Sequence, residues 1–155
     1  MQSWWNRMFM NLPRAPRVYG VTIMFPLLLL NTNSFIDSHF HVGGAAGSDL
    51  QATNCPAITA TVNKNCIAAS LLMHLTPSSS AYLENVWLWT ADHDLDVTNQ
   101  TMISVYAGGG ILIESQGPTW LYGTASEHNV LYQYQLNGAS NLLLGMIQTE
   151  SPYYQ

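Results

Sequence analysis

The chain has 155 residues and few charges: only 8% of its residues are Asp, Glu, Lys or Arg, against roughly 25% in an ordinary soluble domain. This length suffices for one domain with a hydrophobic core. The formal net charge is −5, and the cationic residues are Arg7, Arg14, Arg17 and Lys64. Because nucleic acids and anionic polysaccharides are bound by clustered Lys and Arg, the composition argues against both partners and leaves a neutral glycan open.

Residues 1–34 differ in character from the rest of the chain. A basic flank precedes the almost wholly apolar stretch 18–30, which resembles a signal peptide or signal anchor. However, Pro26 interrupts this stretch, no small-residue cleavage site follows it, and it is short for a membrane span of about 20 residues. A signal-like segment, a core strand and non-native sequence therefore stay open for this region. We expect the folded domain to occupy residues 35–155.

The next segment, residues 34–50, predicts a short strand followed by a Gly-rich turn. His39 and His41 alternate on one face of this strand, as metal ligands can. No third ligand stands at a convincing spacing, so structural histidines are the favoured interpretation. The sequence predicts no metal site and no cofactor.

Two cysteines, Cys55 and Cys66, stand eleven residues apart in a segment rich in Pro, Thr and Asn. This segment reads as an exposed loop, which favours a disulfide in an oxidising compartment over two reduced, buried thiols. The sequon at Asn99 agrees with a secreted, extracellular protein.

Two apolar stretches follow the cysteine loop. Residues 67–75 are compatible with a helix or with a buried strand, because their periodicity does not separate the two. Residues 81–90 alternate in side-chain character and predict a strand.

The acidic residues 91–96 lack the Gly and the distal Glu of a calcium-binding loop, so a solvated turn is the favoured interpretation. Residues 103–106 and 111–114 then predict two strands, with a turn at Gly108–Gly110 between them.

The last third of the chain contains three short apolar and aromatic runs, Trp120–Tyr122, Val130–Leu136 and Leu142–Ile147. Each run is too short for a typical helix and suits a pleated surface. Glu127 stands just before the second run and Glu150 just after the third. Nearly uncharged, aromatic-rich strands with acids at their ends indicate a sugar-handling surface, although two acids in turns carry little weight by themselves.

A weak repeat relates residues 85–89 to residues 129–133 and to residues 141–145, each of which begins with Asn. The first two segments are 44 residues apart, which corresponds to two turns of about 22 residues. This spacing favours an all-β parallel β-helix over a β-sandwich, which fits the strand content equally well. Asn side chains at the turns would then bond to neighbouring rungs.

Several segments together resemble the fungal β-1,3-glucanases of glycoside hydrolase family 55, and the resemblance covers roughly residues 36–155. The matching segments are His41–Leu50 (HVGGAAGSDL), Ala81–Asp96 (AYLENVWLWTADHDLD), Ile111–His128 (ILIESQGPTWLYGTASEH) and Leu131–Gln155 (LYQYQLNGASNLLLGMIQTESPYYQ). The resemblance implies a right-handed parallel β-helix of the pectate-lyase-like type, secretion, and hydrolysis of β-1,3-glucan (a laminarin-like polysaccharide) with inversion. Family members carry two such domains, so it also implies an incomplete solenoid here and a further β-helix domain as partner.

The resemblance also implies roles for individual residues. Glu150, in Gln-Thr-Glu-Ser-Pro-Tyr, matches the family's general acid, and Glu127, in Ser-Glu-His, matches a second carboxylate of the cleft. Tyr153 matches a tyrosine near the attacking water, while Gln148 and Trp120 are the candidate substrate-binding residues. Glu127 precedes Glu150 by close to the length of the predicted repeat, so a β-helix would stack the two acids on neighbouring turns.

The sequence departs from the family pattern at Gly108–Gly110, where Gly-Arg-Gly is more usual. We therefore expect either a glycoside hydrolase fragment that carries the general acid, or a non-catalytic or inactive β-helix fragment that at most binds glycan. A trimeric, tail-spike-like adhesin is a third, weaker interpretation.

Overall fold

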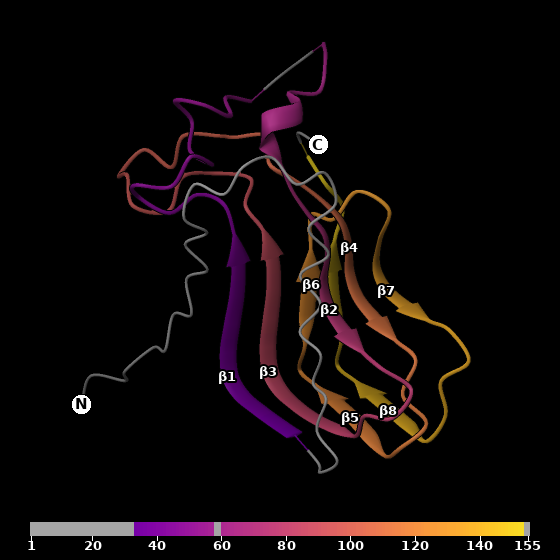
Figure 1. Cartoon of the computed structure of the whole chain (residues 1–155). Helices are drawn as coiled ribbons and strands as arrows, with labels where there is room; N and C mark the ends of the chain where they lie inside the picture. The colour runs from indigo at the N-terminus through magenta and orange to yellow at the C-terminus, as the bar shows by residue number, and fades with distance from the viewer. Residues whose placement is uncertain (1–32, 58–59, 154–155) are drawn as a thin grey trace, which may run out of the picture.

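The computed structural model describes residues 33–57 and 60–153 (Figure 1). These residues form nine strands and one short 3-10 helix, η1 (Lys64–Cys66). The strands are β1 (Asn33–Val42), β2 (Ile67–Leu75), β3 (Ala81–Thr90), β4 (Tyr106–Ile113), β5 (Thr119–Tyr122), β6 (Ala125–Glu127), β7 (Tyr132–Leu136), β8 (Leu142–Gly145) and β9 (Gln148–Glu150). The apolar stretch 18–30 lies outside the described residues. Within them, no helix is long and apolar enough to cross a membrane.

All of the paired strands run parallel, so the all-β expectation is confirmed. β2, β4 and β7 form a three-stranded sheet, in that order. The second sheet has six strands in the order β8-β5-β3-β6-β9, with β1 also paired to β3. The chain passes from the small sheet to the large one three times: through β2 and β3, through β4 to β6, and through β7 to β9 (Figure 1).

In the large sheet the predicted repeat length is correct for the last step between neighbouring passes and wrong for the two steps before it. Glu127 pairs with Glu150 at close to the predicted spacing, whereas Trp89 pairs with Glu127 across a much longer stretch of chain. The longer stretch includes the excursion between β3 and β4. As a result, Asn85 and Asn129 do not occupy equivalent positions, and the alignment of residues 85–89 with 129–133 is wrong.

The main core lies between the two sheets. It is made by the inward-facing, mostly aliphatic side chains of successive passes, which stack along the parallel ladders. Its buried members are Ala69, Leu72, Met73, Leu75, Ala81, Leu83, Val86, Leu88, Ala107, Ile111, Ile113 and Leu121. Residues 67–75, compatible with helix or strand in the sequence, form the strand β2 in this core.

A bend crosses the large sheet at one register position. Asp37, Asn85, Gly123 and Met146 all have left-handed backbone conformations, with φ between 50° and 61°. The pairs on either side, such as Ile36–Glu84 and Ser38–Val86, place these four residues in one row. The bend separates β5 from β6 and β8 from β9, and it divides β1 and β3 into two arms.

The expectation that Asn side chains bond to the neighbouring pass is confirmed at three positions. The side-chain amide of Asn85 donates to Asp37 Oδ1 at 2.7 Å, and that of Asn141 donates to the carbonyl oxygen of Gln116 at 2.9 Å. Asn129 Oδ1 accepts a hydrogen bond from Thr90 Oγ1 at 3.0 Å. These bonds satisfy polar groups where the strands end or bend.

The predicted turn at Gly108–Gly110 is wrong, because these glycines lie inside the single strand β4. They are required by close packing. A Cβ at Gly108 would lie 2.6 Å from the Ser70 carbonyl oxygen, and one at Gly109 would lie 2.5 Å from the ring of Tyr132. The contact at Gly108 is with backbone, whereas the contact at Gly109 is with the outer end of a side chain.

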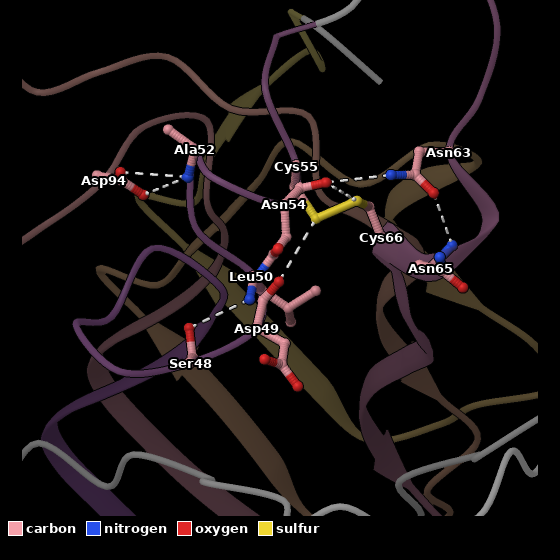
Figure 2. The surroundings of a disulfide bond; sticks show 10 residues. All are labelled: Ser48, Asp49, Leu50, Ala52, Asn54, Cys55, Asn63, Asn65, Cys66 and Asp94. Carbon is pink, nitrogen blue, oxygen red and sulfur yellow. Dashed lines mark hydrogen bonds between the residues drawn. A yellow bond between two sulfur atoms is a disulfide. The ribbon is translucent and has the colours of Figure 1, made fainter.

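The prediction of a solvated turn for residues 91–96 is also wrong. Asp92 and Asp94 are buried. Asp94 accepts from the backbone N–H of Ala52, with both carboxylate oxygens at 3.2 Å (Figure 2). This acidic segment therefore holds the loop that precedes Cys55 against the end of β3.

Cys55 and Cys66 form a disulfide with a Cα–Cα distance of 5.8 Å. Around it lies a second apolar cluster that includes Trp89, Ile103, Val105 and Tyr106. Asn63 supports the loop, since its side chain donates to the Asn54 carbonyl and accepts from the N–H of Asn65 (Figure 2). The disulfide thus closes the loop region at the end of the large sheet.

Candidate functional site

The candidate site lies on one arm of the large sheet, on the face opposite the core. Register places His41, Trp89, Glu127 and Glu150 in one row, and His39, Trp87, Ala125 and Gln148 in the row beside it. Alternate residues of a strand share a face, so both rows point away from Leu88 in the core. Histidine, tryptophan and carboxylate side chains therefore follow one another across this surface.

Glu127 is almost fully buried, with 5% of its surface exposed. Its Oε2 accepts a hydrogen bond from Trp87 Nε1 at 2.7 Å, and its Oε1 accepts one from Gln148 Nε2 at 2.9 Å. Burial raises the pKa of the Glu127 carboxyl, the bond from Trp87 opposes that rise, and the nearby charge of Glu150 adds to it. Trp87 and Gln148 thus hold Glu127 in one orientation.

Glu150 pairs with Glu127 on the neighbouring strand, but its side chain is 40% exposed. Its Oε2 accepts a hydrogen bond from the hydroxyl of Tyr153 at 3.0 Å and lies 3.2 Å from His128 Nε2. The Glu150 carboxylate raises the pKa of the Tyr153 hydroxyl, mainly because it accepts a hydrogen bond from that hydroxyl. This acid is therefore both held by the protein and open to solvent.

His128 follows Glu127 and is buried beneath Glu150. Its backbone N–H donates to the Glu150 carbonyl at 3.0 Å, and its Nδ1 lies 3.1 Å from the Thr90 carbonyl oxygen. The backbone has a φ of 62°, an unusual conformation for a residue with a side chain. The rings of Tyr153 and Trp89 lie 4.9 and 6.3 Å away, centroid to centroid.

The buried amide of Asn129 braces the same corner. Its Nδ2 donates to the Glu127 carbonyl at 3.1 Å and to Gln133 Oε1 at 2.6 Å, and its Oδ1 accepts from Thr90. This network fixes the backbone on either side of His128. A buried polar network that is fully bonded in this way favours one arrangement of the groups it holds.

The structure brings four of the predicted site residues together: Glu127, Gln148, Glu150 and Tyr153. In particular, the prediction that the two acids stack on neighbouring passes agrees with the register. Trp120 lies apart from them, before the bend at Gly123, where it is 38% exposed and pairs with Tyr82 and Leu143. Sequence reasoning missed Trp87, a partner of Glu127, and His128, although the Ser-Glu-His motif contains the latter.

His39 and His41 stack on each other with ring centroids 5.5 Å apart, and both contact Trp87 edge-on. They are part of an aromatic cluster. Among residues 33–57 and 60–153, no three His, Cys, Asp or Glu side chains are grouped so that they could hold a metal ion.

No known family model matches the chain. Over 119 residues the chain is 67% identical to a "Non-secreted LysM effector LysM15" of Penicillium expansum, a match that covers 77% of this chain and 8% of that protein. Over 122 residues it is 52% identical to a "Probable glucan endo-1,3-beta-glucosidase" of Arthroderma benhamiae, covering 77% of this chain and 14% of the relative.

A third relative is a "Glucan 1,3-beta-glucosidase" of Cochliobolus carbonum, 43% identical over 137 residues, which are 88% of this chain and 17% of the relative. The chain therefore spans less than a fifth of the length of each of these curated relatives.

Proposed function

We propose that the chain carries the proton-donating half of a β-1,3-glucan hydrolase of glycoside hydrolase family 55, with Glu150 as the general acid. The observation that carries this proposal is the pairing of Glu127 with Glu150 beside Trp87, Gln148 and Tyr153. The printed names of two relatives, which describe glucan 1,3-β-glucosidase activity, give the substrate class.

Exposure supports the assignment of Glu150 rather than Glu127 as the acid. A general acid must reach the glycosidic oxygen that it protonates. The Glu150 side chain is open to solvent, whereas Glu127 is covered and both of its oxygens accept protein hydrogen bonds. We assign Glu127 to positioning Gln148 and to the electrostatic field of the site.

The contacts of Glu127 argue against it as the base of an inverting pair. Such a base must take a proton from a water that lies beside the sugar. The Glu127 carboxyl is buried, and its two oxygens accept hydrogen bonds from Trp87 and Gln148. Inversion at this site therefore implies that the attacking water is held by polar groups other than Glu127, with Tyr153 as the candidate on this chain.

We further propose that the described residues belong to a right-handed parallel β-helix that a longer solenoid and a second such domain complete. The three stacked passes, the parallel pairing and the row of left-handed residues support this architecture. Secretion is part of the same proposal. The disulfide supports it, because such bonds persist in oxidising compartments.

A second candidate is a non-catalytic β-helix segment that binds glycan or has no activity alone. The relative with 67% identity, whose printed name is that of an effector, favours this alternative. Trp120 and Tyr122, both exposed on the other arm of the bend, offer aromatic faces for such binding.

The experiment measures reducing-sugar release from laminarin by the longer protein that contains this chain, by its Glu150→Gln variant and by the control Glu84→Gln. Glu84 lies on β3 beyond the bend, where it accepts from the hydroxyl of Tyr82. We expect Glu150→Gln to lose about 10²- to 10⁴-fold in rate and Glu84→Gln to keep wild-type activity.

Equal activity of Glu150→Gln and wild type would remove Glu150 from the proposed role. Saturable laminarin binding by the wild-type chain without sugar release would instead support the second candidate. A chain with neither activity nor binding would contradict the hydrolase and the glycan-binding form of the second candidate, and would leave an inactive segment.

A further inference from the structure

The surroundings of the His128 ring determine which of its two nitrogens carries the hydrogen. Its Nδ1 lies 3.1 Å from the carbonyl oxygen of Thr90, and a carbonyl oxygen only accepts hydrogen bonds. The hydrogen of a neutral ring must therefore be on Nδ1. Since the residue is 3% exposed, water does not offer an alternative partner for this contact.

This assignment determines what happens at the other nitrogen. In the neutral ring Nε2 carries no hydrogen, yet it lies 3.2 Å from Glu150 Oε2. Two bare acceptor atoms at this distance repel each other, so a proton must lie between them. Either the Glu150 carboxyl is protonated and donates to Nε2, or the ring is an imidazolium and donates to the carboxylate.

Among the charged groups around the His128 ring, Glu150 is the one that faces Nε2. Asp92 Oδ1 lies 4.0 Å from the opposite nitrogen, Nδ1, and is 2.7 Å from His93 Nδ1. Glu127 is turned to Trp87 and Gln148. The Tyr153 hydroxyl donates to the same oxygen, Oε2, that faces His128.

We propose that His128 is a positioning residue that shares one exchangeable proton with the carboxyl of Glu150 and fixes which carboxyl oxygen presents a proton to solvent. When the ring is an imidazolium, Nε2 and the Tyr153 hydroxyl both donate to Oε2. A further proton on Glu150 is then confined to Oε1. When the ring is neutral, the carboxyl proton of Glu150 points toward Nε2 of His128 and is no longer presented to solvent.

This arrangement deepens the proposed function, on which its catalytic consequence rests. In the doubly protonated pair, the Oε1–H bond breaks and its proton moves to the glycosidic oxygen of the departing sugar. The carboxylate left behind keeps two donors, Tyr153 and the imidazolium, both at Oε2. Solvent then returns the proton to Oε1, and His128 keeps its own hydrogens throughout.

The backbone of the site fits a positioning role. His128 is tied to Glu150 twice, through the ring and through its N–H to the Glu150 carbonyl, although its φ of 62° is one that L-residues rarely adopt. A conformation of this kind persists where surrounding contacts determine it, and such positions gather at functional sites.

The first test does not need activity. Nitrogen-15 NMR of the histidine rings in the whole chain reports which ring nitrogen is protonated as pH varies. We expect Nδ1 of His128 to carry the hydrogen of the neutral ring, and the Nε2 signal to change in Glu150→Gln, because the group that faces this nitrogen is altered.

Glu127→Gln is the matched control, since it removes a neighbouring carboxylate that is bonded elsewhere. We expect a clearly smaller change in the Nε2 signal of His128. Equal changes in the two variants, or a ring whose neutral form carries its hydrogen on Nε2, would overturn the shared proton.

The second test measures kcat, KM and the pH profile of laminarin hydrolysis for His128→Asn. Asn tolerates a positive φ, so the backbone is kept while the ring is removed. We expect kcat to fall about 10- to 100-fold with little change in KM, and the pH profile to lose one ionisation. An unchanged pH profile would contradict the positioning role.

The two proposals fail separately. A longer wild-type protein that contains this chain but releases no sugar would contradict the proposed function and would leave the NMR result on the proton pair intact. An active chain with a normal His128→Asn profile would contradict only the inference about His128.

Discussion

The carboxyl group of Glu127 is buried, and its burial makes the free energy of unfolding depend on pH. Burial raises the pKa of Glu127 in the folded chain above that of the unfolded chain. The stability that Glu127 contributes is therefore fully present below the pKa of the unfolded chain, about 4.3, and is lost as pH rises through the pKa of the folded chain. Glu127→Gln should remove this loss, so the variant gains stability relative to wild type as pH rises from about 4 to 8.

The measurement is the urea unfolding free energy of both chains across that range. Glu114→Gln is a control of opposite sign, because hydrogen bonds from His74 and Asn137 lower the pKa of Glu114. The stability that Glu114 contributes is present above its unfolded pKa and is lost as pH falls through the folded value. Parallel curves for wild type and Glu127→Gln would show that burial does not perturb this carboxyl.

The sequence allowed the relation of Glu127 to Glu150 to be predicted, because their spacing matches one pass of a parallel ladder and is visible in the numbering. It did not allow the contacts of these acids to be predicted. Trp87 reaches Glu127 across a step that the excursion after β3 lengthens, so no short spacing marks the pair. Asp92 reads as a surface acid in the sequence, yet the fold buries it, with its carboxylate near the rings of His93 and His128.

At the scale of the strands, the bend across the large sheet depends more on left-handed backbone conformations than on side-chain contacts. Gly123 has a φ of 61°, and a Cβ there would lie 4.0 Å from its nearest neighbour, the backbone nitrogen of Asn85. Gly123→Ala therefore creates no clash but forces a side chain into the left-handed region. We expect it to cost about 1–2 kcal/mol of unfolding free energy, measured by urea unfolding.

Met146 occupies the same row of the bend one pass later, and there a change to glycine should have the opposite effect on stability. Met146 has a φ of 53°, and 77% of its surface is exposed, so it gives up little packing when replaced. Met146→Gly should stabilise the chain by about 0.5–1 kcal/mol, the relief of strain being partly offset by a more flexible unfolded state. Met146→Leu, which keeps the strained conformation, serves as control and should match wild type in urea unfolding. A destabilised Met146→Gly would contradict this account of the bend.

The bend and the glycine strand mark the limit of what local sequence predicts for the elements. Gly108–Gly110 has the composition of a turn, but the neighbouring strands require residues without side chains at that place. Met146 carries no sequence signal for a positive φ; the row becomes evident only when the passes are placed in register. In contrast, strong alternation in residues 81–90 correctly predicted β3.

At the scale of the whole molecule, the disulfide joins the loop after β1 to η1, directly before β2 of the three-stranded sheet. The loop containing Cys55 is held by Asp94, and the same segment contains Asp92, whose carboxylate lies 4.0 Å from His128 Nδ1. Cys55 and Trp89 belong to the same apolar cluster. Loss of the disulfide should therefore weaken the loop first and the site next, while the core between the sheets is affected least.

The bond closes a loop with a sequence separation of 11 residues, for which chain entropy predicts a contribution of about 3 kcal/mol. We expect the double variant Cys55→Ser, Cys66→Ser to lose about this much unfolding free energy. Hydrogen exchange should show early loss of protection at Ala52 N–H and Ile103 N–H, which bond to Asp94 and Asp92, and retained protection in β4. Uniform loss of protection would instead mean that loop and sheets unfold as one unit, and that the disulfide stabilises the candidate site only through the stability of the whole fold.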